Sequence, residues 1–333
     1  MPAMRARGLT PAPVRARLAA PTTATRTQFP SSLHDPRMHK PSMSSESPFL
    51  VAGGDPAAVV DAIARTARKV RTPCGDGSMV WRVWGKGEPL VLFHGGSGSW
   101  THWIRNISEL SKHYELWLAD IPGLGDSAMP PKPWVPASIA DVVLAGLDQL
   151  FPSHTKLRLA GFSFGGQVAG LSAAVLGDRV CALTLIGVAA LGLRADPREP
   201  FAKQRPGMSP AEIAAVFRQN LAVLMFADPA NIDSLAVHLQ GENIKRARFR
   251  SRPFAATDNL ARALEKVTAP VKTIWGTRDI IARPSIETRL EILRRHHPEL
   301  EVRLIEGAGH WVAYEAAPQF NAAFLELQRA PQR

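Results

Sequence analysis

Cysteine is almost absent from this chain: its 333 residues contain only Cys74 and Cys181. Two cysteines so far apart argue against a disulfide framework and favour a reducing compartment, so we expect a cytoplasmic protein. No run of about 18 or more apolar residues occurs, and we therefore expect no membrane span.

No group of His, Cys, Asp and Glu has metal-ligand spacing, and no glycine-rich loop continues into Gly-Lys-Ser/Thr. The sequence predicts neither a metal nor another cofactor.

Positive charge is concentrated at the N-terminus. The net charge is +11, of which residues 1–48 contribute +5. These residues also hold eight prolines and little aliphatic periodicity, so we expect them to be disordered. Their Arg-rich, acid-poor composition resembles a transit peptide; alternatively, the protein starts at Met38 or Met43. Nucleic-acid binding is not expected, because it needs basic residues on a folded face with aromatics.

The remaining chain alternates short apolar runs with helical patterns, which is typical of βαβ units and a parallel sheet. The alternation stops between residues 191 and 256, where the pattern is helical, irregular and rich in proline. We therefore predict an α/β core over 49–190 and 257–333 with an inserted helical cap at 191–256. The predicted strands are 69–72, 79–84, 90–93, 116–119, 157–160, 180–188, 271–275 and 301–305, and the predicted core helices are 56–69, 139–150, 167–176, 285–295 and 318–327.

Ser163 is the candidate nucleophile. It stands in Gly-Phe-Ser-Phe-Gly-Gly, residues 161–166, directly after a predicted strand and before a predicted helix. In that setting G-x-S-x-G predicts a tight turn that exposes the serine at the carboxyl edge of the sheet. The flanking glycines are needed because side chains there would clash.

His310 and Asp279 are the candidate partners of Ser163. Each follows a predicted strand, in the order serine, aspartate, histidine that belongs to α/β-hydrolases. The histidine would act as general base, and the aspartate would fix its tautomer. Asp196, which follows the preceding strand, is the alternative acid.

A glycine-rich loop, His94 to Ser99, follows the predicted strand 90–93. In α/β-hydrolases one backbone N–H of the oxyanion hole comes from such a loop, and here it would come from Gly96 or Ser97. The other comes from the residue after the nucleophile, Phe164.

Together with Asp120-Ile-Pro-Gly-Leu-Gly, these motifs resemble the α/β-hydrolase fold superfamily over about residues 70–330. Its dehalogenases and epoxide hydrolases use an aspartate where this chain has Ser163, so the resemblance implies the serine branch. His310-Trp311 and the stretch 221–242 look like the meta-cleavage-product hydrolases, with Trp311 as a substrate-binding candidate. The chain departs from them at Phe162, where they carry asparagine, and at Glu242, where they carry an arginine.

The run 245–252 holds five positive charges and no acid. These residues either form a solvated helix face, or one of them, Lys245, Arg246 or Arg248, binds an anionic small-molecule substrate. We expect a serine hydrolase of a small carboxylic ester or lactone. The alternatives are carbon–carbon bond hydrolysis of a diketo acid and a small-molecule receptor with a retained triad.

Overall fold

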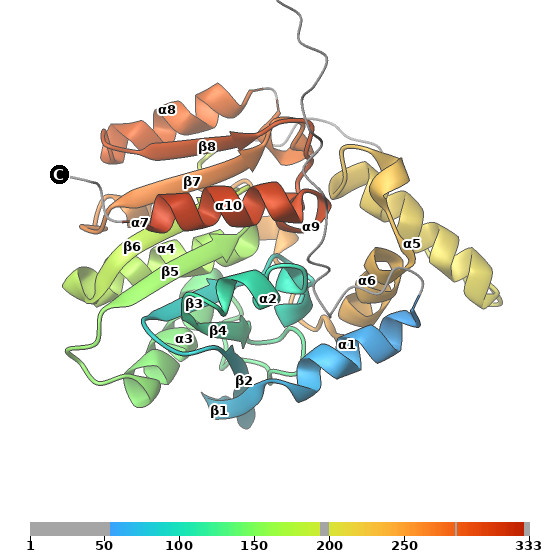
Figure 1. Ribbon diagram of the computed structural model, residues 1–333, viewed down its shortest axis with the longest axis horizontal. Coiled ribbons are helices and arrows are strands. Elements are labelled where there is room, and N and C mark those ends of the chain that lie inside the picture. Colours follow the sequence, from blue (N-terminus) through green and yellow to red (C-terminus); the bar gives the residue numbers. More distant parts are fainter. Residues whose placement is uncertain (1–53, 194–199, 284, 330–333) are drawn as a thin grey trace, which may run out of the picture. The chain divides into compact units, whose positions relative to one another are not determined.

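The computed structural model describes residues 54–193, 200–283 and 285–329, in which eight strands form one sheet (Figure 1). The strands lie in the order β1-β2-β4-β3-β5-β6-β7-β8. The β1–β2 and β2–β4 pairs are antiparallel and the other pairs are parallel. The predicted mostly parallel α/β fold is confirmed, whereas the segment 1–48 lies outside the described residues. The bounds are β1 Arg68–Cys74, β2 Gly77–Trp84, β3 Pro89–Phe93, β4 Glu115–Asp120, β5 Leu157–Phe162, β6 Val180–Ile186, β7 Val271–Gly276 and β8 Glu301–Ile305.

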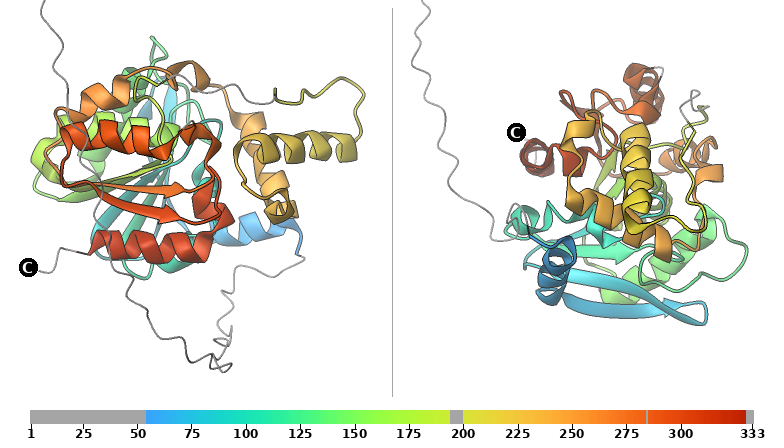
Figure 2. Two further views of the ribbon diagram at one scale, coloured as in Figure 1. Left: turned by 90° about the horizontal axis from the view of Figure 1, so that it is seen from above. Right: turned by 90° about the vertical axis from the view of Figure 1, so that its right-hand side faces the viewer.

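Helices cover both faces of the sheet (Figures 1 and 2). One face packs against α3 (Pro136–Leu150), α4 (Phe164–Leu176), α7 (Asn259–Leu264) and α8 (Ile286–His296). The other packs against α1 (Pro56–Arg65), α2 (Ile107–Leu110), α9 (Val312–Glu315) and α10 (Ala317–Gln328). The sheet is therefore the middle of three layers.

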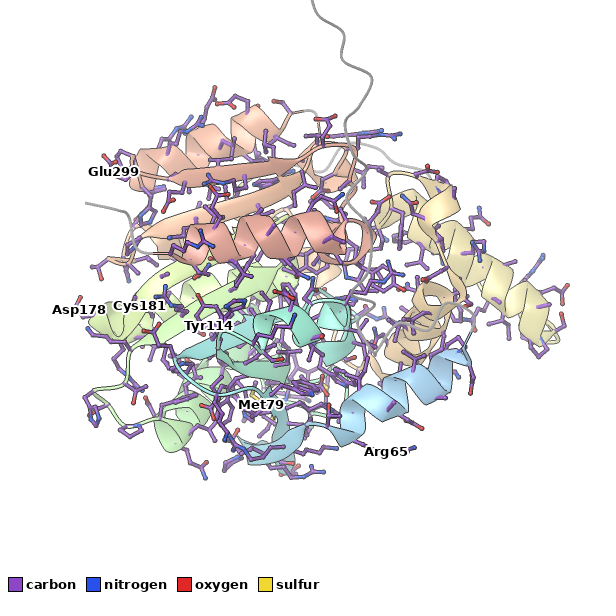
Figure 3. The ribbon with its side chains drawn as sticks, viewed as in Figure 1. Arg65, Met79, Tyr114, Asp178, Cys181 and Glu299 are labelled. Atoms are coloured by element: carbon purple, nitrogen blue, oxygen red, sulfur yellow. The ribbon has the colours of Figure 1, made fainter. Side chains whose placement is uncertain are left out.

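Burial on both faces explains the continuous apolar runs of the central strands. In β3, Leu90, Val91 and Leu92 are all fully buried. Figure 3 shows the same contrast between the interior and the surface: Met79 of β2 is fully buried, whereas Asp178 and Glu299 are exposed.

The first helix is shorter than the sequence suggests. Asp55 caps α1, as the Asp-Pro pair indicates, but the helix ends at Arg65 rather than near residue 69. The hydroxyl of Thr66 donates to the carbonyl of Ile63 at 2.7 Å and accepts from the Trp84 indole at 2.9 Å. These bonds turn the chain into β1, where residues 68 and 69 pair with β2.

Two longer helices occupy the segment between β6 and β7. They are α5 (Pro210–Leu224) and α6 (Ser234–Arg246), and they lie at one end of the sheet in Figure 1. Ser209 and Glu212 form a reciprocal capping box that starts α5. Buried Asn243 of α6 is bonded to Ser99 at 2.7 Å and to Thr101 at 3.2 Å. The described part of this segment contains helices and no strand, and Asp196 lies outside the described residues.

Candidate active site

Ser163 lies at the sharp turn between β5 and α4. Its backbone has φ +52° and ψ −116°, a region that non-glycine residues rarely adopt. Gly165 makes the close approach possible, because a Cβ there would lie 2.6 Å from the carbonyl carbon of Phe93. Strain of this kind persists where the surrounding structure holds it in place.

His310 and Asp279 meet at the carboxyl edge of the sheet. The Nδ1 atom of His310 lies 3.0 Å from Oδ1 and 2.9 Å from Oδ2 of Asp279. Both residues are buried, and Oδ1 also accepts the backbone N–H of Ile281 at 2.7 Å. Asp279 follows β7 and His310 follows β8, so adjacent parallel strands bring them together.

Glu315 anchors the loop that carries His310. Its carboxylate accepts the backbone N–H of Gly309 at 2.7 Å and that of Ala227 at 3.0 Å. In addition, the backbone N–H of Trp311 donates to the carbonyl of Met225 at 2.7 Å. The histidine loop is thus fixed against the chain that follows α5.

The candidate oxyanion donors gather beside Ser163. Phe164 is the first residue of α4, so its backbone N–H has no partner within the helix. Gly96 and Ser97 lie in the loop after β3, where Ser97 has φ +53°. All three line the same cavity as Ser163 and His310. Backbone donors so placed can stabilise an oxyanion on a carbonyl carbon attacked by Ser163.

His94 holds the base of that loop. Its Nε2 accepts the backbone N–H of Ile121 at 2.9 Å, and because an amide nitrogen only donates, the proton is on Nδ1. Nδ1 then donates to the carbonyl of Gly95 at 2.8 Å. Burial lowers the pKa of His94 below its ordinary range, an effect that Asp120 partly offsets. Both ring nitrogens are therefore engaged in structural bonds.

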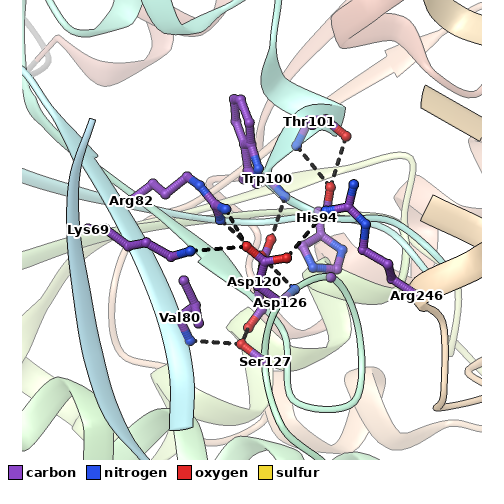
Figure 4. Close-up of polar contacts among 12 residues, drawn as sticks. Lys69, Val80, Arg82, His94, Trp100, Thr101, Asp120, Asp126, Ser127 and Arg246 are labelled. Atoms are coloured by element: carbon purple, nitrogen blue, oxygen red, sulfur yellow. Dashed lines mark hydrogen bonds and ion pairs between the residues drawn. The ribbon is translucent and has the colours of Figure 1, made fainter. Parts of the chain in front are cut away.

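A network of ion pairs lies next to the glycine-rich loop that follows β3 (Figure 4). Arg82 binds Asp120 at 3.0 Å and Asp126 at 2.5 Å, and Asp120 accepts the backbone N–H of Trp100 at 2.8 Å. Burial raises the pKa of Asp126, but its bonds to Arg82 and Lys69 outweigh this and hold it at about 2. The network fixes the entrance of the short helix η1 (Trp100–Trp103).

The cavity above Ser163, which we call the Ser163 cavity, has a volume of about 260 Å³. Helices α5 and α6 form the side opposite the sheet. Its lining comprises Gly95, Gly96, Ser97, His102, Phe162, Ser163, Phe164, Gln167, Ala189, Ile281 and His310 outside these helices, Asn220, Leu224, Gln240 and Ile244 from them, and Phe201, Met225, Ser251, Arg252 and Ala255 from the segments around them.

The structure holds the three predicted basic residues away from this lining. Lys245 pairs with Glu242 at 2.7 Å, and Arg246 pairs with Asp126 at 3.3 Å. Arg248 donates to the backbone carbonyl of Ser127. The member of the basic run that does line the cavity is Arg252, whose guanidinium lies 5.4 Å from the centre of the Phe201 ring.

Trp311 is also placed behind the cavity rather than on its wall. It is 1% exposed, and its indole N–H donates to the carbonyl of His102 at 2.9 Å. Sequence reasoning did not single out His102, Gln167 or Arg252 as lining residues. No motif marks them, because their roles depend on side-chain directions that the sequence does not encode.

Among the described residues, no group of three or more His, Cys, Asp or Glu is arranged to hold a metal ion. Within the same ranges, no helix is both long and apolar enough to cross a membrane.

Residues 90–323 match the model of the alpha/beta hydrolase family. The chain belongs to this family. The match covers the elbow, the Asp279–His310 pair and the glycine-rich loop, so the resemblance seen in the sequence is confirmed. Its eight-stranded, mostly parallel sheet with flanking helices is the alpha/beta hydrolase fold.

Curated relatives differ in chemistry. The chain is 31% identical over 256 residues to a dihydrolipoyllysine-residue acetyltransferase component of an acetoin cleaving system from Pseudomonas putida, covering 73% of this chain and 64% of that protein. The chain thus spans less than two thirds of that relative. It is 26% identical over 262 residues to a 2-hydroxy-6-oxononadienedioate/2-hydroxy-6-oxononatrienedioate hydrolase from Burkholderia vietnamiensis, covering 73% and 87%.

Solved structures share the fold. A bacterial membrane phospholipase A superposes with a TM-score of 0.64 at 25% identity, covering 81% of this chain and 91% of that one. The naproxen esterase of Bacillus subtilis superposes with a TM-score of 0.62 at 19% identity, covering 79% and 92%.

Proposed function

We propose that the chain is a serine hydrolase that cleaves a small carboxylic ester or lactone. The observation that carries this proposal is the arrangement around one cavity. Ser163 stands there on a strained elbow, and His310, bonded through Nδ1 to Asp279, lines the same space. In the proposed triad these residues serve as nucleophile, base and orienting acid.

In the proposed reaction, Ser163 Oγ attacks the substrate carbonyl while His310 takes its proton. Asp279 holds the imidazole in the required tautomer and stabilises the imidazolium. The N–H of Phe164 and that of Gly96 or Ser97 bind the oxyanion. His310 then gives the proton to the departing alcohol, and water releases the acid from the acyl-enzyme by the same steps.

Several features support a small substrate beneath a helical cap formed by α5 and α6. A cavity of about 260 Å³ holds a small acyl group and part of its alcohol. Leu224 of α5 and Ile244 of α6 add apolar surface opposite Ser163, and Arg252 adds a positive charge. That charge favours a substrate with an anionic group away from the reacting carbon.

Carbon–carbon bond hydrolysis of a diketo acid is the second candidate. The curated relative from Burkholderia vietnamiensis, a 2-hydroxy-6-oxononadienedioate/2-hydroxy-6-oxononatrienedioate hydrolase, motivates it. Two local features favour the ester instead. Phe162 precedes the nucleophile and lines the cavity with an apolar ring. Glu242, near the position of the arginine in those hydrolases, is paired with Lys245 and Arg246. A small-molecule receptor would bind a ligand in the same cavity without turnover.

Labelling with a fluorophosphonate probe tests the proposal. The probe should modify Ser163, located by peptide mass spectrometry, and p-nitrophenyl esters of short acids should be hydrolysed. Ser163→Ala should abolish both, and His310→Ala should reduce both severely because the general base is lost. Ser172→Ala, on the same helix as the elbow, serves as the matched serine control. Hydrolysis by Ser163→Ala at the wild-type rate contradicts the proposal, and tight binding without turnover favours the receptor.

A further inference from the structure

A second histidine lines the Ser163 cavity. His102 lies in η1, directly after the glycine-rich loop, and is 3% exposed. Its ring contacts those of Phe162 and Trp311, with centroids 5.6 and 5.0 Å away. Gly98 lies against the ring, since a Cβ there would be 2.5 Å from Nδ1 and 2.7 Å from Nε2. The imidazole is therefore held in one orientation.

The hydrogen bond that His102 accepts fixes its tautomer. The backbone N–H of Gly95 donates to Nδ1 at 3.2 Å. Because an amide nitrogen only donates, Nδ1 carries a lone pair, and the neutral ring carries its proton on Nε2. Within the part of the chain that the structure describes, no protein group accepts from Nε2. The residue itself lines the cavity, where this unpartnered N–H can meet a ligand.

This donor stays neutral. Burial holds the pKa of His102 well below its ordinary range, and the nearby rings of His94 and His310 lower it further. The two histidines also differ in the partner of Nδ1, which is the backbone N–H of Gly95 for His102 and the carboxylate of Asp279 for His310. A neutral imidazole with one fixed proton is suited to hydrogen-bonding an uncharged oxygen rather than to moving protons.

We propose that His102 determines specificity by donating from Nε2 to a second oxygen on the acyl part of the substrate. Gly95, which holds Nδ1, directly precedes the candidate oxyanion donors Gly96 and Ser97, so the imidazole lies beside the place where the scissile carbonyl binds. A hydroxyl, alkoxyl or keto oxygen on the adjacent carbon is the group within its reach. The inference rests on the proposed serine hydrolase function and narrows the substrate to acyl groups oxygenated at C2.

Two esters of equal length test the proposal: p-nitrophenyl methoxyacetate and p-nitrophenyl butyrate, which differ by an oxygen in place of a methylene. His102→Phe keeps an aromatic ring against Phe162 and Trp311 and removes the donor. We expect the ratio of kcat/KM for methoxyacetate over butyrate to fall about 3- to 10-fold, the scale of one neutral hydrogen bond. His102→Gln, whose amide can donate, should restore part of the ratio. His113→Phe, at an exposed position, is the control.

A purely structural role gives a different result. If His102 only supports Gly95, His102→Phe lowers kcat/KM for both esters alike and the ratio is unchanged, which overturns the proposal. In the wild-type protein, the ratio should also be constant between about pH 6 and 9, because the donor does not titrate there.

Nitrogen-15 NMR of the imidazoles in the Ser163→Ala protein tests the donor without turnover. We expect His102 to show a protonated Nε2 and an unprotonated Nδ1, and the Nε2–H signal to shift with methyl methoxyacetate but not with methyl butyrate. A proton on Nδ1, or an equal response to both esters, overturns the proposal. If the wild-type protein hydrolyses neither p-nitrophenyl ester, the proposed function fails, and this spectrum still decides the role of His102.

Discussion

Asp279 places both carboxylate oxygens within 3.0 Å of a single nitrogen, Nδ1 of His310. An anion in that position accepts a hydrogen bond from Nδ1–H, so that in the proposed mechanism Nε2 can receive a proton from Ser163. Asp279→Asn substitutes an amide that can donate to Nδ1 and so favours the wrong tautomer. We expect kcat to fall by about 10³–10⁴-fold, near the effect of the same change in a serine protease, with KM little altered. Steady-state kinetics on a p-nitrophenyl ester measure this.

Asp76→Asn, at the exposed turn between β1 and β2, is the matched control and should keep wild-type kcat. If Asp279→Asn retains full activity, another acid serves His310, and Asp196 becomes the residue to replace.

Arg252 is the basic residue to test for anion recognition. Arg252→Gln should raise KM for the p-nitrophenyl monoester of succinate by about fivefold, the scale of ~1 kcal/mol for a solvent-screened ion pair. A neutral ester of equal length should be unaffected. Lys245→Gln is the control, because Lys245 is exposed and paired with Glu242. Equal effects of Arg252→Gln on the two esters would leave the charge without a role in recognition.

Glu315 connects stability to catalysis. Its carboxylate accepts several backbone N–H groups, including Gly309 beside His310, whereas a glutamine has one acceptor oxygen. Glu315→Gln should therefore destabilise the fold by about 1–3 kcal/mol and lower kcat about tenfold through misplacement of His310. Urea unfolding and kinetics check the two effects. Glu306→Gln, exposed in the same loop, should change neither.

Asp126 predicts how stability depends on pH. Its pKa in the folded protein is about 2, below the ordinary 3.8, so the folded state favours the ionised form. The contribution is fully present above about pH 4 and is lost as the pH falls toward 2. Asp126→Asn should cost about 1–2 kcal/mol at pH 7, and the difference from wild type should shrink below pH 4. A difference in urea midpoint that is constant down to pH 2 contradicts this.

Much of the core could be predicted from the sequence because its signals are local. The strand before Ser163 and the runs that became β6 and β7 are continuous apolar segments, as burial on both faces requires. The residues proposed as the triad follow these strands and β8, and parallel strands bring such positions to one edge. The strand order is not a local property and came only from the structure.

The residues that line the cavity could not be predicted either, because which side chains face it is not a local property of the sequence. The basic run contains Lys245, Arg246, Arg248 and Arg252, and nothing in its composition distinguishes the residue that lines the cavity from those paired with Glu242 or Asp126. The distinction depends on the end of α6 at Arg246 and on where the following chain turns. His102 was not predicted as a lining residue either, because its proposed role depends on a contact with Gly95 and not on a motif.

The anchoring of α6 bears on how the proposed ester substrate reaches Ser163. Asn243 is 3% exposed and bonded to Ser99 and Thr101, and one turn later Arg246 is paired with Asp126. Swinging α6 outward would leave buried polar groups without partners, which is costly. We therefore expect α6 to stay in place over the cavity and not to move away from it at a lipid surface. Hydrolysis of a medium-chain ester should rise smoothly with concentration, with no jump in rate when the ester begins to form micelles.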